Sequence, residues 1–247
     1  FKEYLNKRID PADNFDGLLE YPKFIEIETV NACNARCPMC TINDWERNYP
    51  IMKDDVFKKI SDDLIENKHF LKRVSLYRDG EPLVDKKLPQ RVKYLKDNGI
   101  ENVTIATNVS LLNNKRSEML LEAGLDQVIF SIDSLKKDVF EEIRVRLNFD
   151  EVLENAINFF KLRDKINPKC RVWVRMIRQE TNKDEWKDYK EFWLKYAKPV
   201  DRIYYHDIFN WGGQLDNFKA VSKSYEPNLP CVALWSLMVF FANGDVP

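Results

Sequence analysis

Three cysteines lie close together at Cys33, Cys37 and Cys40, in the stretch TVNACNARCPMCTI, although the whole chain contains only five. Structural zinc sites and ordinary ferredoxin clusters both use four protein ligands. A cluster held by three thiolates leaves one iron with an open position, and open positions on metals are where substrates bind and react. The C-x3-C-x2-C spacing therefore favours a reactive iron–sulfur centre. A zinc site completed by a distant ligand, such as His69 or His206, is the alternative.

Composition narrows the class of protein further. The 247 residues include 39 basic and 40 acidic side chains, a net charge of −1, and no basic run stands out. Nucleic acid and anionic membrane are therefore not expected as primary partners. No apolar run approaches the roughly 20 residues of a membrane helix, and the charged N-terminus does not resemble a signal peptide. An odd, bunched set of cysteines is not a disulfide framework, so a reducing, cytoplasmic setting is expected.

Short β-branched and aromatic runs alternate with amphipathic helical patterns along the chain. The expected strands are residues 24–30, 73–77, 102–107, 127–133, 171–177 and 201–208. The expected helices are residues 53–67, 88–99, 115–124, 149–166 and 184–197. Such alternation predicts parallel strands joined by right-handed crossovers. Six units suit a partial (β/α)6 TIM-like barrel better than a closed eightfold one. The cysteine loop follows the first strand, at the end where parallel α/β folds carry their chemistry.

The chain divides by pattern into three parts. Residues 1–22 form an N-terminal segment, residues 23–208 form the barrel, and residues 209–247 form a short C-terminal extension. The extension is loop-like at first and ends in a strand followed by an Asn-Gly turn, which predicts a β-hairpin. The chain stops as the second strand of this hairpin begins, so a longer protein is expected.

The cysteine triplet resembles the signature of the radical S-adenosylmethionine (radical SAM) superfamily. In that family three thiolates in the loop after the first barrel strand hold a 4Fe–4S cluster. S-adenosylmethionine chelates the unique iron through its amino and carboxylate groups. An electron from the cluster then splits a sulfur–carbon bond, and the resulting 5′-deoxyadenosyl radical abstracts hydrogen from a substrate. The resemblance also implies an electron donor such as a flavodoxin or ferredoxin.

Further motifs of the family match in order. YRDGEPLVDKKL (77–88) resembles its G-E-P loop, TIATNVSLL (104–112) its T-N-G region with Val109 in place of glycine, and IFSIDS (129–134) its fourth strand. FEEIR (140–144) and RVWVRMI (171–177) match the helical segment and strand that follow. By this resemblance the cofactor is bound by Met39, Gly80, Glu81, Pro82, Asn108, Ser131, Asp133, Arg144, Arg175 and Ile177.

The resemblance also implies a role for each group. Met39 and Ile177 would lie near the adenine, and the 80–82 loop would accept hydrogen bonds from the methionyl ammonium. Ser131 and Asp133 share one face of a strand and would reach the carboxylate or the ribose. The guanidinium of Arg144 suits a clamp on the carboxylate, and Arg175 would lie near the cofactor.

Plainer interpretations exist for several of these residues. Glu81 taken alone would be a surface carboxylate, Asp133 a helix N-cap and Arg144 a solvated helix residue. Cys170 begins a strand, which predicts a small buried side chain at the barrel floor, away from the chemistry.

The tail resembles the start of a SPASM or twitch extension, which binds an auxiliary iron–sulfur cluster. Cys231 and Gly244 have the separation found in that motif, and its next cysteine would fall just beyond Pro247. Cys231 is therefore a candidate ligand of an auxiliary cluster, with a buried structural thiol as the alternative.

The expected activity is oxidoreductase-type radical chemistry on a small-molecule or sugar-type substrate, with net dehydrogenation favoured over epimerisation or peptide modification. Candidate substrate residues are Tyr77, His206 and Trp211. Two classes without enzyme activity stay open, a zinc-stabilised binding module and an iron–sulfur electron carrier.

Overall fold

The computed structural model describes residues 20–44, 51–209, 211–215, 231 and 233–247. Most of the expected N-terminal segment, and Asn210 and residues 216–230 of the expected extension, lie outside the described residues. The three-part division of the chain therefore stays a prediction. No helix in the described ranges is both long and apolar enough to cross a membrane.

A single parallel sheet of seven strands organises the described chain. The strands are β1 (Phe24–Ile27), β2 (Arg73–Ser75), β3 (Val103–Thr107), β4 (Gln127–Ser131), β5 (Arg171–Arg178), β6 (Arg202–Asp207) and β7 (Leu237–Phe240). Their order is β6-β5-β4-β3-β2-β1-β7, so the first six follow one another in chain order. This is the arrangement of an open α/β barrel, and the predicted fold class is confirmed.

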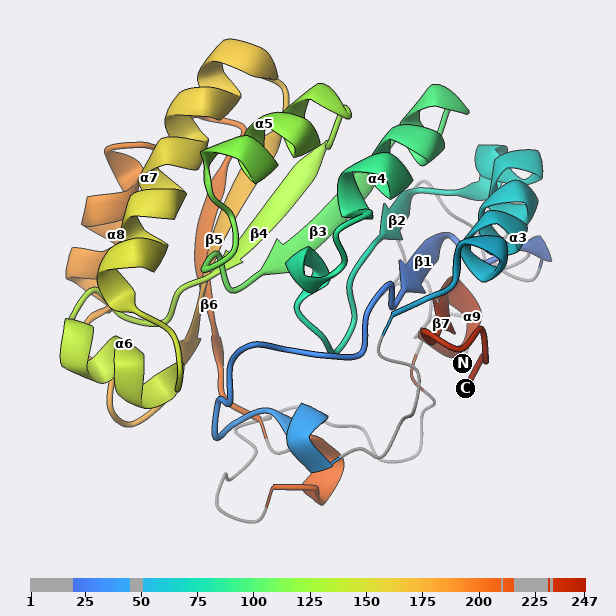
Figure 1. Cartoon of the computed structure of the whole chain (residues 1–247). Coiled ribbons are helices and arrows are strands. Elements are labelled where there is room, and N and C mark those ends of the chain that lie inside the picture. The colour runs from blue at the N-terminus through green and yellow to red at the C-terminus, as the bar shows by residue number, and fades with distance from the viewer. Residues whose placement is uncertain (1–19, 45–50, 210, 216–230, 232) are drawn as a thin grey trace, which may run out of the picture.

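Helices lie between successive strands, as expected from the sequence. They are α3 (Asp54–Glu66), α4 (Leu88–Asp97), α5 (Asn114–Glu122), α6 (Lys137–Ile143), α7 (Phe149–Ile166) and α8 (Trp186–Leu194). Short helical turns occur at η1 (Thr41–Asp44), η2 (Lys68–Phe70), η3 (Pro82–Val84), η4 (Trp211–Gly213) and α9 (Ala233–Ser236). Side-chain oxygens of Asn113 and Asn148 accept the backbone N–H groups that open α5 and α7, as good N-caps do. The long helices cover one face of the sheet (Figure 1).

The two faces of this sheet differ in chemistry. The helix-covered face is apolar and fully buried, with Ile25, Val74, Val103, Ile105, Val128, Val172 and Val174. The opposite face, which we call the inner face, has in register across four strands Ser75, Thr104, Gln127 and Arg171. Closed barrels fill their interior with branched apolar side chains. The polar inner face here is suited to holding a polar ligand.

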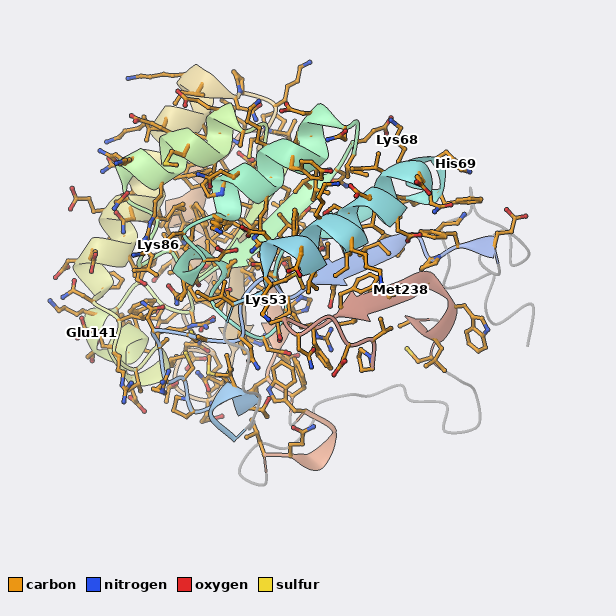
Figure 2. The ribbon with its side chains drawn as sticks, turned by 45° about the vertical axis from the view of Figure 1, so that its right-hand side comes forward. Lys53, Lys68, His69, Lys86, Glu141 and Met238 are labelled. Carbon is orange, nitrogen blue, oxygen red and sulfur yellow. The ribbon has the colours of Figure 1, made fainter. Side chains whose placement is uncertain are left out.

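Strand β7 joins the sheet at its free edge. It pairs in parallel with β1 from Phe24↔Leu237 to Ile27↔Phe240. Figure 2 labels Met238 on this strand. The predicted hairpin is thus represented by its first strand and by the turn that Phe241 N closes on Asp245 O at 2.9 Å. In the described residues the partner of β7 is β1 rather than a second hairpin strand, because edge pairing satisfies its backbone groups.

A buried ion pair fixes the amino ends of β5 and β6, at the barrel floor. The guanidinium of Arg163 donates to both carboxylate oxygens of Asp201, at 2.8 and 2.9 Å, and to Cys170 O at 2.8 Å. Asp201 also accepts from Val172 N and Lys198 N, both at 2.7 Å. Cys170 is fully buried here, as predicted. One carboxylate therefore joins α7, β5 and the connection into β6.

Removing this carboxylate should destabilise the fold strongly. We expect Asp201→Ala to lower the free energy of unfolding by about 3–5 kcal/mol, because it leaves a buried guanidinium uncompensated. Asp164→Ala is the matched control, since Asp164 bonds the same Arg163 at 2.6 Å but is substantially exposed; we expect it to cost less than about 1 kcal/mol. Urea unfolding of both variants provides the measurement, and equal losses would contradict the assignment.

Candidate functional site

The cysteine loop begins at the carboxyl end of β1 and is held there by the loop after β2. A side chain at Gly80 would place its Cβ 2.3 Å from Val30 O and 2.8 Å from Ala32 O, so only glycine permits this approach. The next residue, Glu81, donates its backbone N–H to Ala32 O at 2.9 Å. The predicted G-E-P loop therefore packs directly against the start of the cysteine loop.

The Glu81 side chain also joins this assembly to β3. Its Oε1 accepts from Thr107 Oγ1 at 2.7 Å and from Leu83 N at 3.1 Å, and its Oε2 accepts from Asn108 N at 2.7 Å. Burial raises the pKa of Glu81 to about 7, although these donated bonds lower it. The carboxylate points into the chain and not outward, so the interpretation of Glu81 as a surface carboxylate is wrong. Any acceptor that residues 80–82 offer to a ligand must therefore come from their backbone.

The turn after β3 is strained and firmly anchored. Val109 has a φ of 70°, a conformation that costs a β-branched residue free energy and that glycine adopts freely. Thr107 Oγ1 accepts from Val109 N at 2.9 Å, and Asn155 Nδ2 donates to Val109 O at 3.2 Å. The turn thus keeps the left-handed shape that a T-N-G motif would have. It directs Asn108 Nδ2 to Asn34 Oδ1 at 2.9 Å.

The three thiols lie among N–H donors. Cys33 Sγ is 3.4 Å from Ala35 N and 3.9 Å from Asn108 Nδ2, and Cys37 Sγ is 3.7 Å from Arg144 Nη1. Burial, the largest effect, raises the pKa of Cys33 to about 11 and also raises that of Cys40. The thiols of Cys33 and Cys40 therefore keep their protons at neutral pH until a metal displaces them, and N–H donors stabilise sulfurs that have become anionic.

Arg144 is held beside this loop by Asp133. Asp133 is fully buried, and its Oδ2 accepts from Arg144 Nε at 2.6 Å while its Oδ1 accepts from Ile177 N at 2.7 Å. Arg144 Nη2 is buried without a hydrogen-bond partner in the described chain. A buried guanidinium N–H of this kind is suited to an added anion. Asp133 is therefore not an N-cap and Arg144 is not a solvated helix residue, while contact of Asp133 with a cofactor stays a prediction.

The remaining predicted residues lie along the same edge or on the inner face. Ser131 Oγ accepts from Arg175 Nη2 at 2.8 Å. The indole of Trp211 donates to Met39 O at 2.8 Å, which brings the segment after β6 onto the cysteine loop. Tyr77 and His206 extend the inner face from the ends of β2 and β6. Burial, with Arg175 and Arg202 nearby, lowers the pKa of His206.

Cys231 is a separate case. Its side chain is exposed, so the alternative of a buried structural thiol is wrong.

Sequence reasoning missed the residues that support these groups. Asn182 Nδ2 donates to Asp133 O at 2.8 Å and to Ile177 O at 2.9 Å, while its Oδ1 accepts from Gln179 N. Asn34 Nδ2 donates to Ser110 Oγ at 2.8 Å. Both asparagines are in loops just after a strand, where an amide can satisfy several backbone groups at once. That position is the signal that could have found them.

The groups around the three thiols are suited to an iron–sulfur cluster. Arg144 and Asn108 direct N–H groups at two of the sulfurs, and such donors stabilise thiolates that bind a metal. The unpartnered Arg144 Nη2 agrees in addition with a bound anionic ligand.

The sequence matches the radical SAM superfamily over residues 27–191. The chain belongs to this superfamily.

Curated relatives include a GTP 3′,8-cyclase of Limosilactobacillus fermentum, 27% identical over 213 residues, which is 84% of this chain and 59% of that protein. A GTP 3′,8-cyclase of Clostridium perfringens is 31% identical over 189 residues, which is 72% of this chain and 53% of that protein. A third relative is the tungsten-containing aldehyde ferredoxin oxidoreductase cofactor-modifying protein of Pyrococcus furiosus. It is 36% identical over 113 residues, which is 46% of this chain and 31% of that protein. The chain thus spans less than two thirds of the length of these relatives.

Solved structures share the fold. SuiB of Streptococcus suis bound to S-adenosylmethionine aligns with a TM-score of 0.69 at 15% identity, over 92% of this chain and 60% of that one. The anSMEcpe structure with bound AdoMet aligns with a TM-score of 0.63 at 15% identity, over 92% of this chain and 73% of that one. BtrN in complex with AdoMet and 2-DOIA aligns with a TM-score of 0.58 at 20% identity, over 92% of this chain and 72% of that one. At these identities the likeness concerns the fold alone.

We expect Arg144→Lys to weaken binding of S-adenosylmethionine at least about tenfold, because lysine keeps the charge but loses the fork that reaches Asp133 and a ligand at once. The nearby exposed Arg146→Lys is the matched control and should bind normally. Equilibrium dialysis on anaerobically reconstituted proteins of equal iron content makes the comparison. Unchanged affinity in Arg144→Lys would remove Arg144 from the site.

Proposed function

We propose that this chain is the catalytic core of an enzyme that cleaves S-adenosylmethionine reductively and abstracts hydrogen from a small-molecule or sugar-type substrate. The observation that carries the proposal is the buried Arg144, which bonds Asp133, approaches the Cys37 thiol and keeps one N–H unpartnered. A guanidinium N–H held beside a thiol triplet is suited to a carboxylate that must bind next to a cluster.

The roles of the chain's residues follow from their neighbours. Cys33, Cys37 and Cys40 would hold a 4Fe–4S cluster, and Arg144 would donate to the methionyl carboxylate. Bound together, the cluster and S-adenosylmethionine would supply a 5′-deoxyadenosyl radical when an electron donor such as a flavodoxin or ferredoxin reduces them.

We propose further contacts between S-adenosylmethionine and the residues around the cluster. The backbone of the 80–82 loop would accept from the methionyl ammonium, since the Glu81 side chain is fully engaged. Met39 and Ile177 would pack near the adenine, and Ser131 with Arg175 would bind the ribose or the carboxylate. Trp211 would close the site by its bond to Met39 O. A reducing, cytoplasmic compartment, which keeps the thiols reduced, stays our prediction for its location.

A cysteine series tests the assignment of the cluster. We expect Cys37→Ala to lose the visible absorbance of the cluster after anaerobic reconstitution and to release no 5′-deoxyadenosine, because two thiolates do not hold a cubane. Cys170→Ala removes a thiol at the barrel floor and should keep both signals, apart from a small loss of stability. Normal iron content and normal deoxyadenosine release in Cys37→Ala would overturn the proposal.

The same assay separates the other classes. A zinc-stabilised module would stay colourless, and an electron carrier would be coloured but would leave S-adenosylmethionine intact. GTP belongs among the first substrates to be tried, since the curated relatives are named GTP 3′,8-cyclases.

We further propose that residues 209–247 begin a SPASM or twitch extension and that Cys231 ligates an auxiliary cluster. The exposed thiol of Cys231 is accessible to such a cluster. A second cluster could accept the electron of a substrate radical, so the net reaction would be a two-electron oxidation and not an epimerisation or a peptide modification.

Iron counting on the longest natural form of the protein tests this extension. We expect clearly more than the four irons per chain of a single cubane, with the excess lost in Cys231→Ala while deoxyadenosine release persists. The product should be two hydrogens lighter than the substrate. About four irons per chain would remove the auxiliary cluster, and a product of unchanged mass would exclude dehydrogenation.

A further inference from the structure

The inner face of the barrel has an unusual excess of positive charge. Arg73 on β2, Arg175 on β5 and Arg202 on β6 all lie on this face, as the strand register places them beside Phe24, Ser131 and Trp173 respectively. Among the described residues, none of the three forms an ion pair with an acidic side chain. The acidic Glu26 on the same face is engaged by Arg78 at 2.5 Å. The excess is therefore local, in a chain whose overall charge is close to zero.

The three guanidinium groups come from separate strands, and all three act on one phenol. Burial is the largest effect on the pKa of Tyr204 and raises it, while Arg175, Arg202 and Arg73 all act to lower it. Arg73 and Arg175 act in the same direction on Tyr77, which follows β2. Arginines from opposite parts of the curved sheet thus lie within electrostatic reach of the same side chains.

Aromatic rings hold Arg73 and Arg202 without using their N–H edges, whereas Arg175 donates Nη2 to Ser131 Oγ. The Arg73 guanidinium lies 5.2 Å from the ring centre of Phe24, and that of Arg202 lies 5.3 Å from Trp173 and 4.8 Å from Tyr204. Stacking occupies the face of a guanidinium and leaves its fork free to donate. The Nε atoms of Arg73 and Arg175 are buried without a partner in the described structure.

Neutral polar groups beside the arginines are also unsatisfied. The hydroxyls of Ser75 and Thr104 and the amide nitrogen of Gln127 are buried on the inner face with no hydrogen-bond partner in the described chain. Buried polar groups are normally paired, so a set of unpaired ones on one face indicates a missing partner. Donors predominate in this set, and the missing partner is therefore rich in acceptors.

We propose that the substrate carries an anionic group, a phosphate or a carboxylate, which binds on the inner face between Arg73 and Arg202. This inference rests on the proposed function and adds the class of substrate to it. Arg175 bonds Ser131 at the edge where the cofactor would bind, and Arg202 pairs with Trp173, two residues earlier on β5. The anion would thus lie up to about 7 Å deeper along the strands than Arg175, and it would orient the rest of the substrate toward the cysteine loop.

Direct binding of small anions tests the site. The probes are pyrophosphate for a phosphate ester and malonate for a carboxylate, measured by calorimetry on the full chain with and without S-adenosylmethionine. We expect one of the two to bind, and the double variant Arg73→Gln/Arg202→Gln to weaken that binding at least tenfold, as loss of charged hydrogen-bond donors does. Preference for pyrophosphate would assign a phosphate ester, and preference for malonate a carboxylate.

Two control variants make the result specific. Lys161→Gln/Lys165→Gln removes the same charge from the exposed side of α7, on the helix-covered side of the sheet, and should bind the probe normally. Arg73→Lys/Arg202→Lys keeps the charge and should retain part of the affinity, which excludes simple misfolding. Absence of binding by the native chain, or an equal loss in the Lys161 control, would overturn the proposal. Deoxyadenosine release in the same preparations reports on the proposed function separately, so the two can fail independently.

Discussion

The buried carboxylate of Glu81 is the interaction on which the site depends most. It follows Gly80, whose lack of a side chain allows the loop after β2 to touch the cysteine loop. Its two oxygens then bind the end of β3 through Thr107 and Asn108. The loops after β1, β2 and β3 are therefore one hydrogen-bonded unit, and this unit fixes the positions of the thiols. Without this carboxylate the buried donors of β3 would have no acceptor, at a cost of about 1–3 kcal/mol for each.

A second constraint comes from the opposite chemistry of the two sheet faces. Helices bury a continuous layer of valine and isoleucine on one face, and this apolar layer supplies most of the driving force for folding. The inner face contributes little to this driving force, so its positions can be occupied by arginine, serine and threonine. The fold can thus keep unsatisfied polar groups on one face because the other face, together with the Arg163–Asp201 pair at the floor, stabilises the strands.

Much of this arrangement was predictable from the sequence, because it depends on short-range patterns. The strands and helices begin within a few residues of their expected positions, since apolar periodicity and Asn caps are local signals. The cysteine triplet and the G-E-P motif are local as well. The inward direction of Glu81, the pairing of Asp133 with Arg144 and the edge position of β7 were not predictable in this way. Each depends on contacts between residues far apart in the chain, which no local pattern records.

Val109 shows how such long-range contacts can replace a local rule. A glycine would adopt the φ of 70° found at this position without strain, whereas a valine does so only at a cost in free energy. The turn keeps its shape because Thr107, Asn155 and the buried packing of the valine itself hold it from several sides. The strain, of order 1–3 kcal/mol, is sustained by these contacts. This strained turn directs the side chain of Asn108 toward Cys33 and Asn34, so contacts from distant residues set the position of an N–H donor beside the cysteine loop.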